Sequence, residues 1–318
     1  MKNIVLLAGG VGGAKAAKGL YQSAYKDNLS IIGNVGDDDE FHNLWVSPDL
    51  DTLTYTLANE VNPVTGWGLK NDSCRILSRL AQFGSSTWMH LGDMDIATHI
   101  FRSAKRAEGM TMTAITRQIT TRLGITVPLL PATDDTLQTR LETENGWVDF
   151  QTYFVHQRCE ANVTNIAYEG AHLASATPEV LAAISAADII VFAPSNPLLS
   201  IAPMLAIPQF RDALSASNAT KIAVSPLIGG KAIKGPAEKL LQQMSYTPGN
   251  KGIAEFYQDI CDVLVIDNQD EGETNVIESF GLHAHCTSTL MKSDHDKVAL
   301  MEEVISAATT YQPEVPCA

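Results

Sequence analysis

A glycine-rich segment near the N-terminus has the composition of a phosphate-binding turn. Residues 9–13 read GGVGG and follow the apolar run Ile4–Leu7 directly. Glycines at a strand end let the backbone approach a phosphate, and the next helix offers free N–H groups and a positive dipole end. We therefore predict nucleotide or phosphate binding by Gly9, Gly10, Gly12, Gly13 and Lys15. A tight turn that serves packing alone is the alternative.

The spacing of these glycines narrows the kind of nucleotide site. It matches neither the GxGxxG pattern with its later ribose-binding acid nor the Walker pattern that ends in GK[ST]. A nicotinamide-dependent dehydrogenase is therefore disfavoured, because that class needs the first of these patterns.

Carboxylates are concentrated just after the glycine segment. Residues 37–40 read DDDE, and two more aspartates lie in residues 47–52, which read SPDLDT. Clustered carboxylates without a neighbouring base repel one another, and a hard cation such as Mg²⁺ relieves this repulsion. We therefore predict Mg²⁺ as a cofactor, with Asp37, Asp38 and Asp49 as its ligands. The alternative is a solvated loop, with Asp49 stabilising a helix N-terminus.

Small polar residues follow several other predicted strands. They offer hydroxyl, amide and backbone donors at strand ends, where doubly wound sheets bind ligands. Such a set suits a nucleotide base and ribose, although turn-forming residues also occur at strand ends for structural reasons. The predicted nucleotide-binding residues of this kind are Asn34, Ser195, Asn196, Ser225 and Gly229.

Two histidines are candidates for polar contact or proton transfer near neutral pH. His90 precedes Leu91-Gly92-Asp93, and His99 lies further along the same stretch. Packing in the core is the alternative for both. A third group, His283, His285 and Cys286, lacks a second ligand set at zinc-like spacing and is interpreted as part of a strand or loop.

The order of apolar runs predicts an α/β fold. A strand, the glycine segment, a helix and a second strand open a doubly wound parallel sheet. Ser47 and Pro48 have the pattern of an N-cap followed by proline at the first helical position. We predict helices at 14–25, 48–60, 72–82, 97–108, 113–123, 178–186 and 294–310, and strands at 4–7, 29–33, 88–91, 188–192, 221–224 and 263–266.

Residues 128–171 differ from the rest of the chain. Alternating strand-like pieces at 139–143, 147–152 and 163–168, with turn residues between them, predict a small antiparallel insertion. The chain is therefore interpreted as a doubly wound, mostly parallel, Rossmann-like core of residues 1–127 and 172–318, with an inserted α+β subdomain at 128–171.

Composition and charge exclude several classes of protein. The 318 residues carry 36 acidic and 22 basic side chains, a net charge of −14, which argues against a nucleic-acid binder. No apolar run approaches the roughly 18 residues of a membrane span. Five cysteines form an odd number without a CxxC pair, and the N-terminus opens into a strand-like run. We expect a reduced, cytoplasmic protein without a targeting peptide.

The net charge is unevenly distributed along the chain. Residues 1–26 carry four bases and no acid, whereas residues 27–69 carry eight acids and no base. The acidic block contains the aspartates discussed above, so it is the predicted metal and substrate region. Residues 255–318 carry thirteen acids and two lysines, which we interpret as a solvated surface.

Taken in order, these segments resemble the 2-phospho-L-lactate transferase family of deazaflavin coenzyme (F-420) biosynthesis. The resemblance covers nearly the whole chain and includes the later segments Leu130-Pro131 and Tyr257-Gln258-Asp259. The other segments that carry it, specific only in this order, are 9–15 (GGVGGAK), 34–38 (NVGDD), 47–52 (SPDLDT), 67–72 (WGLKND), 91–99 (LGDMDIATH), 194–197 (PSNP), 225–226 (SP) and 235–237 (GPA).

The resemblance implies a reaction and a set of partners. A guanosine diphospho-linked three-carbon acid donates its phospho-acid portion to the ribityl hydroxyl of the deazaflavin Fo and releases GMP, with Mg²⁺ present. The acid is 2-phospholactate, phosphoenolpyruvate or 3-phosphoglycerate in different members. The sequence leaves this choice open, because the acids differ by a hydroxyl, a double bond or the position of the phosphate. A homodimer is the expected assembly.

The resemblance also implies roles for individual residues. It assigns contacts with Fo to Asp51 and to His90, where other members can carry lysine or arginine. Met94 replaces a basic residue of the family pattern. Because phosphoryl transfer depends mainly on positioning and charge neutralisation, we predict catalytic roles for Asp51, next to the attacking hydroxyl, and for Asp37.

A different class of protein shares the predicted fold. It is a non-catalytic regulator that binds a nucleotide sugar and resembles this chain in the glycine segment. We expect such regulators to lack the SPDLDT and WGLKND segments, and both segments are present here.

Overall fold

The computed structural model describes residues 2–312 and contains strands β1 to β14 and helices α1 to α12. The strands are β1 (Ile4–Ala8), β2 (Leu29–Gly33), β3 (Asp39–Phe41), β4 (Leu44–Val46), β5 (Leu129–Pro131), β6 (Gln138–Thr143), β7 (Gly146–Asp149), β8 (Val163–Glu169), β9 (Ile189–Phe192), β10 (Thr220–Val224), β11 (Leu227–Ile228), β12 (Lys231–Ala232), β13 (Val263–Asp267) and β14 (His283–Thr287). The helices are α1 (Gly10–Gln22), α2 (Pro48–Leu57), α3 (Arg75–Gln82), α4 (Asp93–Ala107), α5 (Met112–Arg122), α6 (Pro178–Ala186), α7 (Ala202–Leu205), α8 (Pro208–Ala216), α9 (Ala237–Gln243), α10 (Asn250–Tyr257), α11 (Thr274–Glu278) and α12 (Asp294–Thr310).

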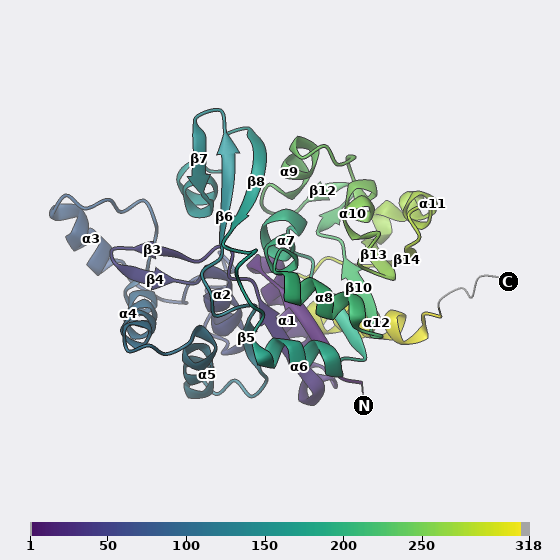
Figure 1. Cartoon of the computed structure of the whole chain (residues 1–318), viewed down its shortest axis with the longest axis horizontal. Helices are drawn as coiled ribbons and strands as arrows, with labels where there is room; N and C mark the ends of the chain where they lie inside the picture. The colour runs from purple at the N-terminus through teal and green to yellow at the C-terminus, as the bar shows by residue number, and fades with distance from the viewer. Residues whose placement is uncertain (1, 313–318) are drawn as a thin grey trace.

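A seven-stranded parallel sheet forms the centre of the molecule (Figure 1). Its order is β14-β13-β10-β9-β1-β2-β5, so β1 lies between β2 and β9. The chain order reverses at this point, which makes β1 and β9 the switch point of a doubly wound sheet. The predicted α/β fold with a Rossmann-like sheet is confirmed.

The central strands are continuous apolar runs because both faces of the sheet are covered. β1 and β13 are buried at every residue, as expected for the interior of a parallel sheet. α1 packs against α2 and α12, whereas α6 packs against α8. α12 follows the last strand and contacts β9 and β10, so it covers the sheet beside α1.

A small antiparallel sheet, β7-β6-β8, lies outside the central sheet (Figure 1). It corresponds to the three strands predicted between residues 139 and 168. The predicted insertion at 128–171 also includes β5, which pairs with β2 in parallel and so belongs to the central sheet. The antiparallel part therefore begins at Gln138, and the predicted division into domains stays a prediction.

One local prediction was wrong, and one short hairpin was missed. Residues 88–91, predicted as a strand, form no strand and lie in the connection between α3 and α4. Their apolar side chains pack against neighbouring elements; Trp88, for instance, meets Phe41 of β3 edge to face, and Leu91 clusters with Val46, Leu77 and Ile96. The β3/β4 hairpin was missed, because three-residue strands give little periodicity.

None of the helices in residues 2–312 combines the length and apolar character needed to cross a membrane. Cys74, Cys159, Cys261 and Cys286 are free thiols. Cys317, the fifth cysteine, lies outside the described residues.

Candidate active site

The carboxyl ends of β1, β2 and β9 bring three predicted segments together. Gly9 follows β1, Asn34 follows β2, and Ser195 lies three residues after the end of β9. The Ser195 hydroxyl donates to the Gly9 carbonyl at 2.7 Å, and the Gly9 N–H lies 3.4 Å from the same hydroxyl oxygen. The switch point of the sheet is therefore closed by direct contacts between residues predicted to bind the nucleotide.

The glycine segment forms the first turn of α1 and not a loop before it. α1 begins at Gly10, whose φ of 63° is in the left-handed region that glycine tolerates. A Cβ on Gly12 would collide with the Pro194 carbonyl, and one on Gly9 would lie 2.5 Å from Asp49 Oδ2. Close packing thus explains these glycines, while the N–H groups of the first turn still lack partners within the helix.

Asp37 and Asp49 share one amide donor. Asn34 Nδ2 donates to Asp49 Oδ2 at 2.9 Å and to Asp37 Oδ1 at 3.1 Å, and the Gly10 N–H donates to Asp49 Oδ1 at 2.6 Å. Burial raises the pKa of Asp37 well above its usual range, and the Asp49 charge raises it further. Burial raises the pKa of Asp49 to about 6, although bonds from Asn34 and Gly10 oppose it. The pair is short of positive charge.

Asp38 is directed away from this pair. Its Oδ2 accepts hydrogen bonds from Ser47 Oγ at 2.6 Å and from Trp45 Nε1 at 3.1 Å. Its Oδ1 is buried without a hydrogen-bond partner among the described residues. Burial raises the pKa of Asp38 to about 7, and the bond from Ser47 and the Arg102 charge oppose this. The structure therefore brings together two of the three predicted metal ligands.

Ser47 occupies the N-cap position of α2, as predicted, but its side chain does not cap the helix. Its hydroxyl donates to Asp38 instead, which removes it from the helix N–H groups. Asp49 and Asp51, both in the first turn of α2, supply the negative charge that favours this helix end.

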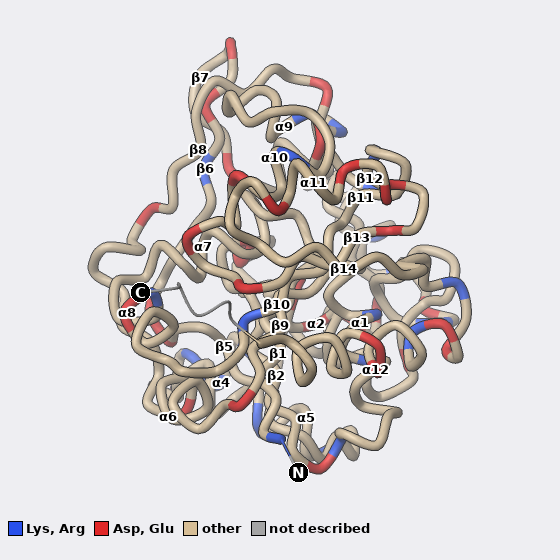
Figure 2. The backbone as a smooth tube through the Cα atoms, turned by 90° about the vertical axis from the view of Figure 1, so that its right-hand side faces the viewer, with Lys and Arg blue, Asp and Glu red and all other residues tan. Residues whose placement is uncertain are grey.

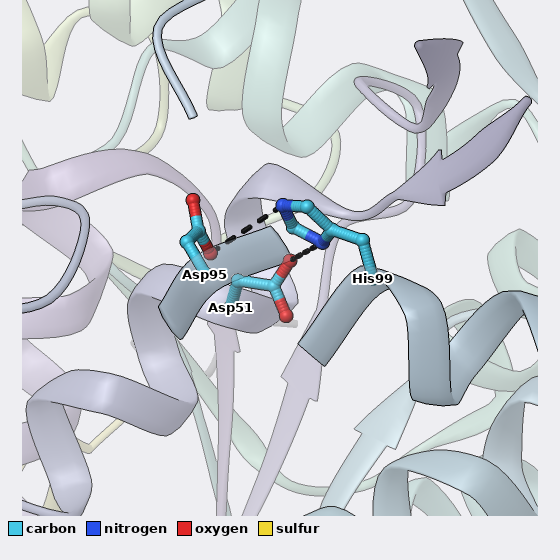
Figure 3. Close-up of side chains that lie close together, drawn as sticks. All are labelled: Asp51, Asp95 and His99. Carbon is cyan, nitrogen blue, oxygen red and sulfur yellow. Dashed lines mark ion pairs between the residues drawn. The ribbon is translucent and has the colours of Figure 1, made fainter. Parts of the chain in front are cut away.

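Asp51 belongs to a second buried network, between α2 and α4. Arg102 Nη2 donates to Asp51 Oδ1, and Arg102 Nη1 donates to Asp51 Oδ2 at 3.1 Å. His99 Nδ1 lies 3.7 Å from Asp51 Oδ2 (Figure 3). Burial works to lower the pKa of the Arg102 guanidinium, but the Asp51 charge and hydrogen bonds outweigh it and raise that pKa.

Asp95 completes this network from the start of α4. Tyr55 donates its hydroxyl to Asp95 Oδ1 at 2.7 Å, and His99 Nε2 lies 3.4 Å from the same oxygen. Burial works to raise the pKa of Asp95, yet its contacts with His99 and Tyr55 and the Arg102 charge hold it below the ordinary value. Figure 3 shows that Asp95 and Asp51 each face a different nitrogen of the imidazole ring.

His90 lies apart from these networks on an exposed connection. Its Nε2 is 3.4 Å from Cys74 Sγ, and its ring meets Trp67 edge to face with centroids 6.2 Å apart. The connection is fixed to α4 by Asp72, which accepts from the backbone N–H groups of Met94 and Asp95. The conformation of the WGLKND segment thus has a structural reason, and contact of His90 with Fo stays a prediction.

The Lys15 side chain points toward the residues that follow β14, the strand at one edge of the central sheet. Its Nζ donates to the Met291 carbonyl at 3.1 Å, in the connection between β14 and α12. Burial lowers the pKa of Lys15, and the charges of Lys234 and Lys297 lower it further. A bound anion would relieve the repulsion among these three lysines, which is consistent with the predicted role in phosphate binding.

The remaining predicted nucleotide-binding residues follow β9, β10 and β11. Asn196 accepts from the N–H groups of Leu198 and Leu199, which leaves its Nδ2 buried without an acceptor among the described residues. Ser225 Oγ donates to Asn250 Oδ1 at 2.5 Å, and the Gly229 N–H donates to Asp270 Oδ2 at 3.0 Å. Both of these are held by side chains that the sequence did not single out.

Comparison with known families shows to which family the chain belongs. The family model of 2-phospho-L-lactate transferase CofD matches residues 4–309. The chain belongs to this family. The match extends through the central sheet, the antiparallel sheet and α12, so the fold and both polar networks lie inside it.

Curated relatives of this CofD-family chain are named as transferases. A "2-phospho-L-lactate transferase" of Methanosarcina mazei is 34% identical, and the alignment covers 96% of this chain and 100% of the relative. A "phosphoenolpyruvate transferase" of Streptomyces griseus is 36% identical, with 94% of this chain and 95% of the relative covered. Relatives with two different names therefore match about equally well, so identity alone does not select the donor.

Solved structures support the fold of this CofD-family member. A protein of the UPF0052 family from Bacillus halodurans superposes with a TM-score of 0.64 and covers 96% of this chain, with 98% of its own length covered. Its identity is 15%, so it shows shared architecture only.

Arg102 is the main site residue that sequence reasoning missed. Asp95, His99 and Arg102 are spaced by four and three residues, which places them on one face of a helix. That pattern was visible in the sequence. What it lacked was the position of Asp51, some fifty residues earlier, which only the packing of α2 against α4 supplies.

Proposed function

We propose that this protein transfers a phospho-three-carbon-acid group from a guanosine diphospho-linked donor to the ribityl hydroxyl of the deazaflavin Fo, as a step of F-420 coenzyme biosynthesis. The observation that carries the proposal is the family match over residues 4–309, with relatives named for transfer of 2-phospholactate or phosphoenolpyruvate. The proposal includes a cytoplasmic enzyme that works as a homodimer.

The chemical step is a phosphoryl-type displacement. The ribityl oxygen of Fo forms a bond to the phosphorus that bears the acid, and the bond from that phosphorus to the bridging oxygen breaks. GMP leaves with the bridging oxygen, and the proton of the hydroxyl passes to Asp51 and from there to water. Such a step needs alignment and charge neutralisation more than covalent help from the protein.

In this proposal Asp51 accepts a hydrogen bond from the attacking hydroxyl and orients it. Asp51 is suited to this role because its carboxylate is fixed by Arg102 and lies in the first turn of α2, two residues from Asp49. His90, on the exposed connection before α4, contacts the other end of Fo. The predicted catalytic role of Asp37 is to hold Mg²⁺ against the diphosphate.

The proposed Mg²⁺ fits Asp37 and Asp49 best. Both side chains are buried, and their only shared donor in the described residues is the neutral amide of Asn34. Oxygen ligands of this kind are those that Mg²⁺ prefers. When bound, the cation supplies positive charge to the transferring phosphoryl group. Asp38 would contribute its negative charge without binding the cation, because Ser47 holds its carboxylate.

The donor nucleotide is proposed to lie across the ends of β1, β9 and β10. The first turn of α1 offers N–H groups to the diphosphate, and Lys15 adds positive charge. The buried Nδ2 of Asn196 is a donor that still needs an acceptor, which a nucleotide can provide.

The test is a transfer assay with defined substrates. The purified protein is incubated with Fo, Mg²⁺ and each of the three donors in turn, and GMP and the new deazaflavin product are measured. We expect product with one donor in clear preference, and loss of product with a chelator. Transfer that persists in chelator would contradict the proposed Mg²⁺ requirement.

The competing regulator has its own signature in the same experiment. It predicts no product with any donor, together with tight binding of a uridine nucleotide sugar. That combination would overturn the proposed transferase function.

A further inference from the structure

Among the described residues, the Arg102 guanidinium is the only permanently charged cation that contacts Asp51. Arg102 is 2% exposed and engages both carboxylate oxygens of Asp51 with two different nitrogens. Such a fork fixes both the position and the plane of a carboxylate, which a single contact does not. The orientation of Asp51 is therefore set from α4.

The same cluster has the outline of a metal site, but Arg102 argues against that use. One ligand atom each from Asp51, Asp95 and His99 lies within 4.8 Å of the others (Figure 3). Arg102 Nη1 lies 3.1 Å from Asp51 Oδ2 and 3.2 Å from His99 Nδ1, so a guanidinium already stands beside two of the three ligands. A metal ion there would meet a buried positive charge.

The contacts of Arg102 also define the hydrogen positions behind it. A guanidinium can only donate, so His99 Nδ1 accepts and the ring hydrogen is on Nε2. Nε2 faces Asp95 Oδ1 at 3.4 Å, and that oxygen also accepts from Tyr55. His99 and Asp95 on α4 and Tyr55 on α2 thus lie behind Arg102, and His99 Nε2 makes no hydrogen bond within the described residues.

We propose that Arg102 is a positioning residue that presents Asp51 to the attacking hydroxyl of Fo. The proposal rests on the transferase function proposed above. A carboxylate has about four acceptor positions, and the two bonds from Arg102 leave others for the substrate. Arg102 itself contacts no substrate in this proposal; it acts through Asp51.

Arg102→Lys is the decisive variant. It keeps the positive charge that compensates the buried carboxylates but loses the two-nitrogen fork. Arg117→Lys is the matched control, because Arg117 on α5 forms an exposed pair with Glu179. For both variants and the natural protein we would measure the Tm, the dissociation constant of Fo from its fluorescence without donor, and the kcat and KM for Fo and for the donor.

We expect Arg102→Lys to remain folded, with kcat/KM for Fo reduced by about 10- to 100-fold, because small misplacements of an orienting group have effects of this size. Binding of Fo should weaken, and the KM for the donor should stay unchanged. Arg117→Lys should behave as the natural protein does.

Two outcomes would overturn the assignment. One is that KM and kcat for Fo in Arg102→Lys equal those of the natural protein. The other is a fall in kcat with both KM values and Fo binding unchanged, which a merely structural role predicts. Absence of Fo binding and of transfer in the natural protein would instead reject the proposed function itself.

Discussion

Individual carboxylates of the site differ in what compensates their charge. Asp51 faces the Arg102 guanidinium, whereas Asp37 and Asp49 share only the Asn34 amide. Asp38 accepts two neutral donors and keeps one oxygen without a partner in the described residues. Burial raises the pKa values of Asp37, Asp38 and Asp49. A bound cation would therefore stabilise this part of the site most.

The raised pKa of Asp38 predicts a pH-dependent stability. Its pKa of about 7 in the folded protein lies above an unfolded value of roughly 3.9. The folded state therefore binds the proton more tightly, and the resulting stability is lost as the pH rises from roughly 4 through 7. Asp38→Asn removes this titration and keeps an oxygen acceptor.

We compare the free energy of unfolding of Asp38→Asn with that of the natural protein. The difference, variant minus natural protein, should increase by roughly 2–3 kcal/mol between pH 5 and pH 8. The measurement is chemical denaturation at both pH values with a chelator present. Asp212→Asn, on the exposed surface of α8, should show no such trend. A constant difference for Asp38→Asn would show that Asp38 ionises normally in the folded state.

Asp51→Asn tests the residue that the proposal places next to the hydroxyl. The amide nitrogen would face Arg102 donor to donor, so the group loses both its charge and its orientation. We expect transfer to fall by about 100-fold, roughly 2.7 kcal/mol of transition-state stabilisation, and Fo to bind more weakly. Normal transfer with unchanged Fo affinity would reject the role of Asp51, and Asp212→Asn serves again as the control.

At the scale of elements, the contact between α1 and the end of β9 builds the switch point. The first turn of α1 lies so close to the Pro194 carbonyl that Gly12 has no room for a side chain. The helices α2 and α4 act in the same way for the second network, since α2 contributes Asp51 and α4 contributes Arg102. Each network is thus a property of two elements in contact.

Gly12→Ala tests the first of these contacts. The added methyl group would force α1 away from the Pro194 carbonyl, and overpacking of this kind costs about 1–3 kcal/mol. We expect a lower Tm and weaker donor binding, measured by thermal unfolding and titration calorimetry. Gly272→Ala is the control, because its methyl group would meet no atom within 4 Å. An unchanged Tm for Gly12→Ala would show that α1 can move away from the Pro194 carbonyl without loss of stability.

At the scale of the whole molecule, the acidic excess is spread over many elements. In Figure 2 the acidic positions are scattered along the tube and do not gather on one segment. Acids of the C-terminal block also have local partners, such as Asp294 with Lys18 at 2.9 Å and with Lys297 at 2.6 Å. The interpretation of that block as a solvated surface was wrong for Asp267 and Asp270, which are buried and accept hydrogen bonds from backbone N–H groups.

The assembly is also a property of the whole molecule. The proposed homodimer predicts a mass in solution of twice the 34.3 kDa of the chain. Sedimentation equilibrium over a range of concentrations measures this directly. A single species at the mass of one chain would reject the homodimer without affecting the proposed chemistry.

The sequence by itself determined the parallel sheet and the segments that end at its carboxyl edge. Apolar runs such as Ile4–Ala8 and Val263–Asp267 are buried on both faces, so their composition alone predicts central strands. The short β3/β4 hairpin and the irregular conformation of residues 88–91 were not predictable, because short pieces lack a clear period.

Tertiary structure decided how the polar residues are divided. Asp37, Asp38, Asp49 and Asp51 form one acidic block in the sequence, yet they belong to different hydrogen-bond networks in the structure. The physical reason is that a buried charge takes its partner from whatever element packs beside it, at any distance along the chain. The partner of Asp51 is Arg102, and only the packing of α4 against α2 could reveal it.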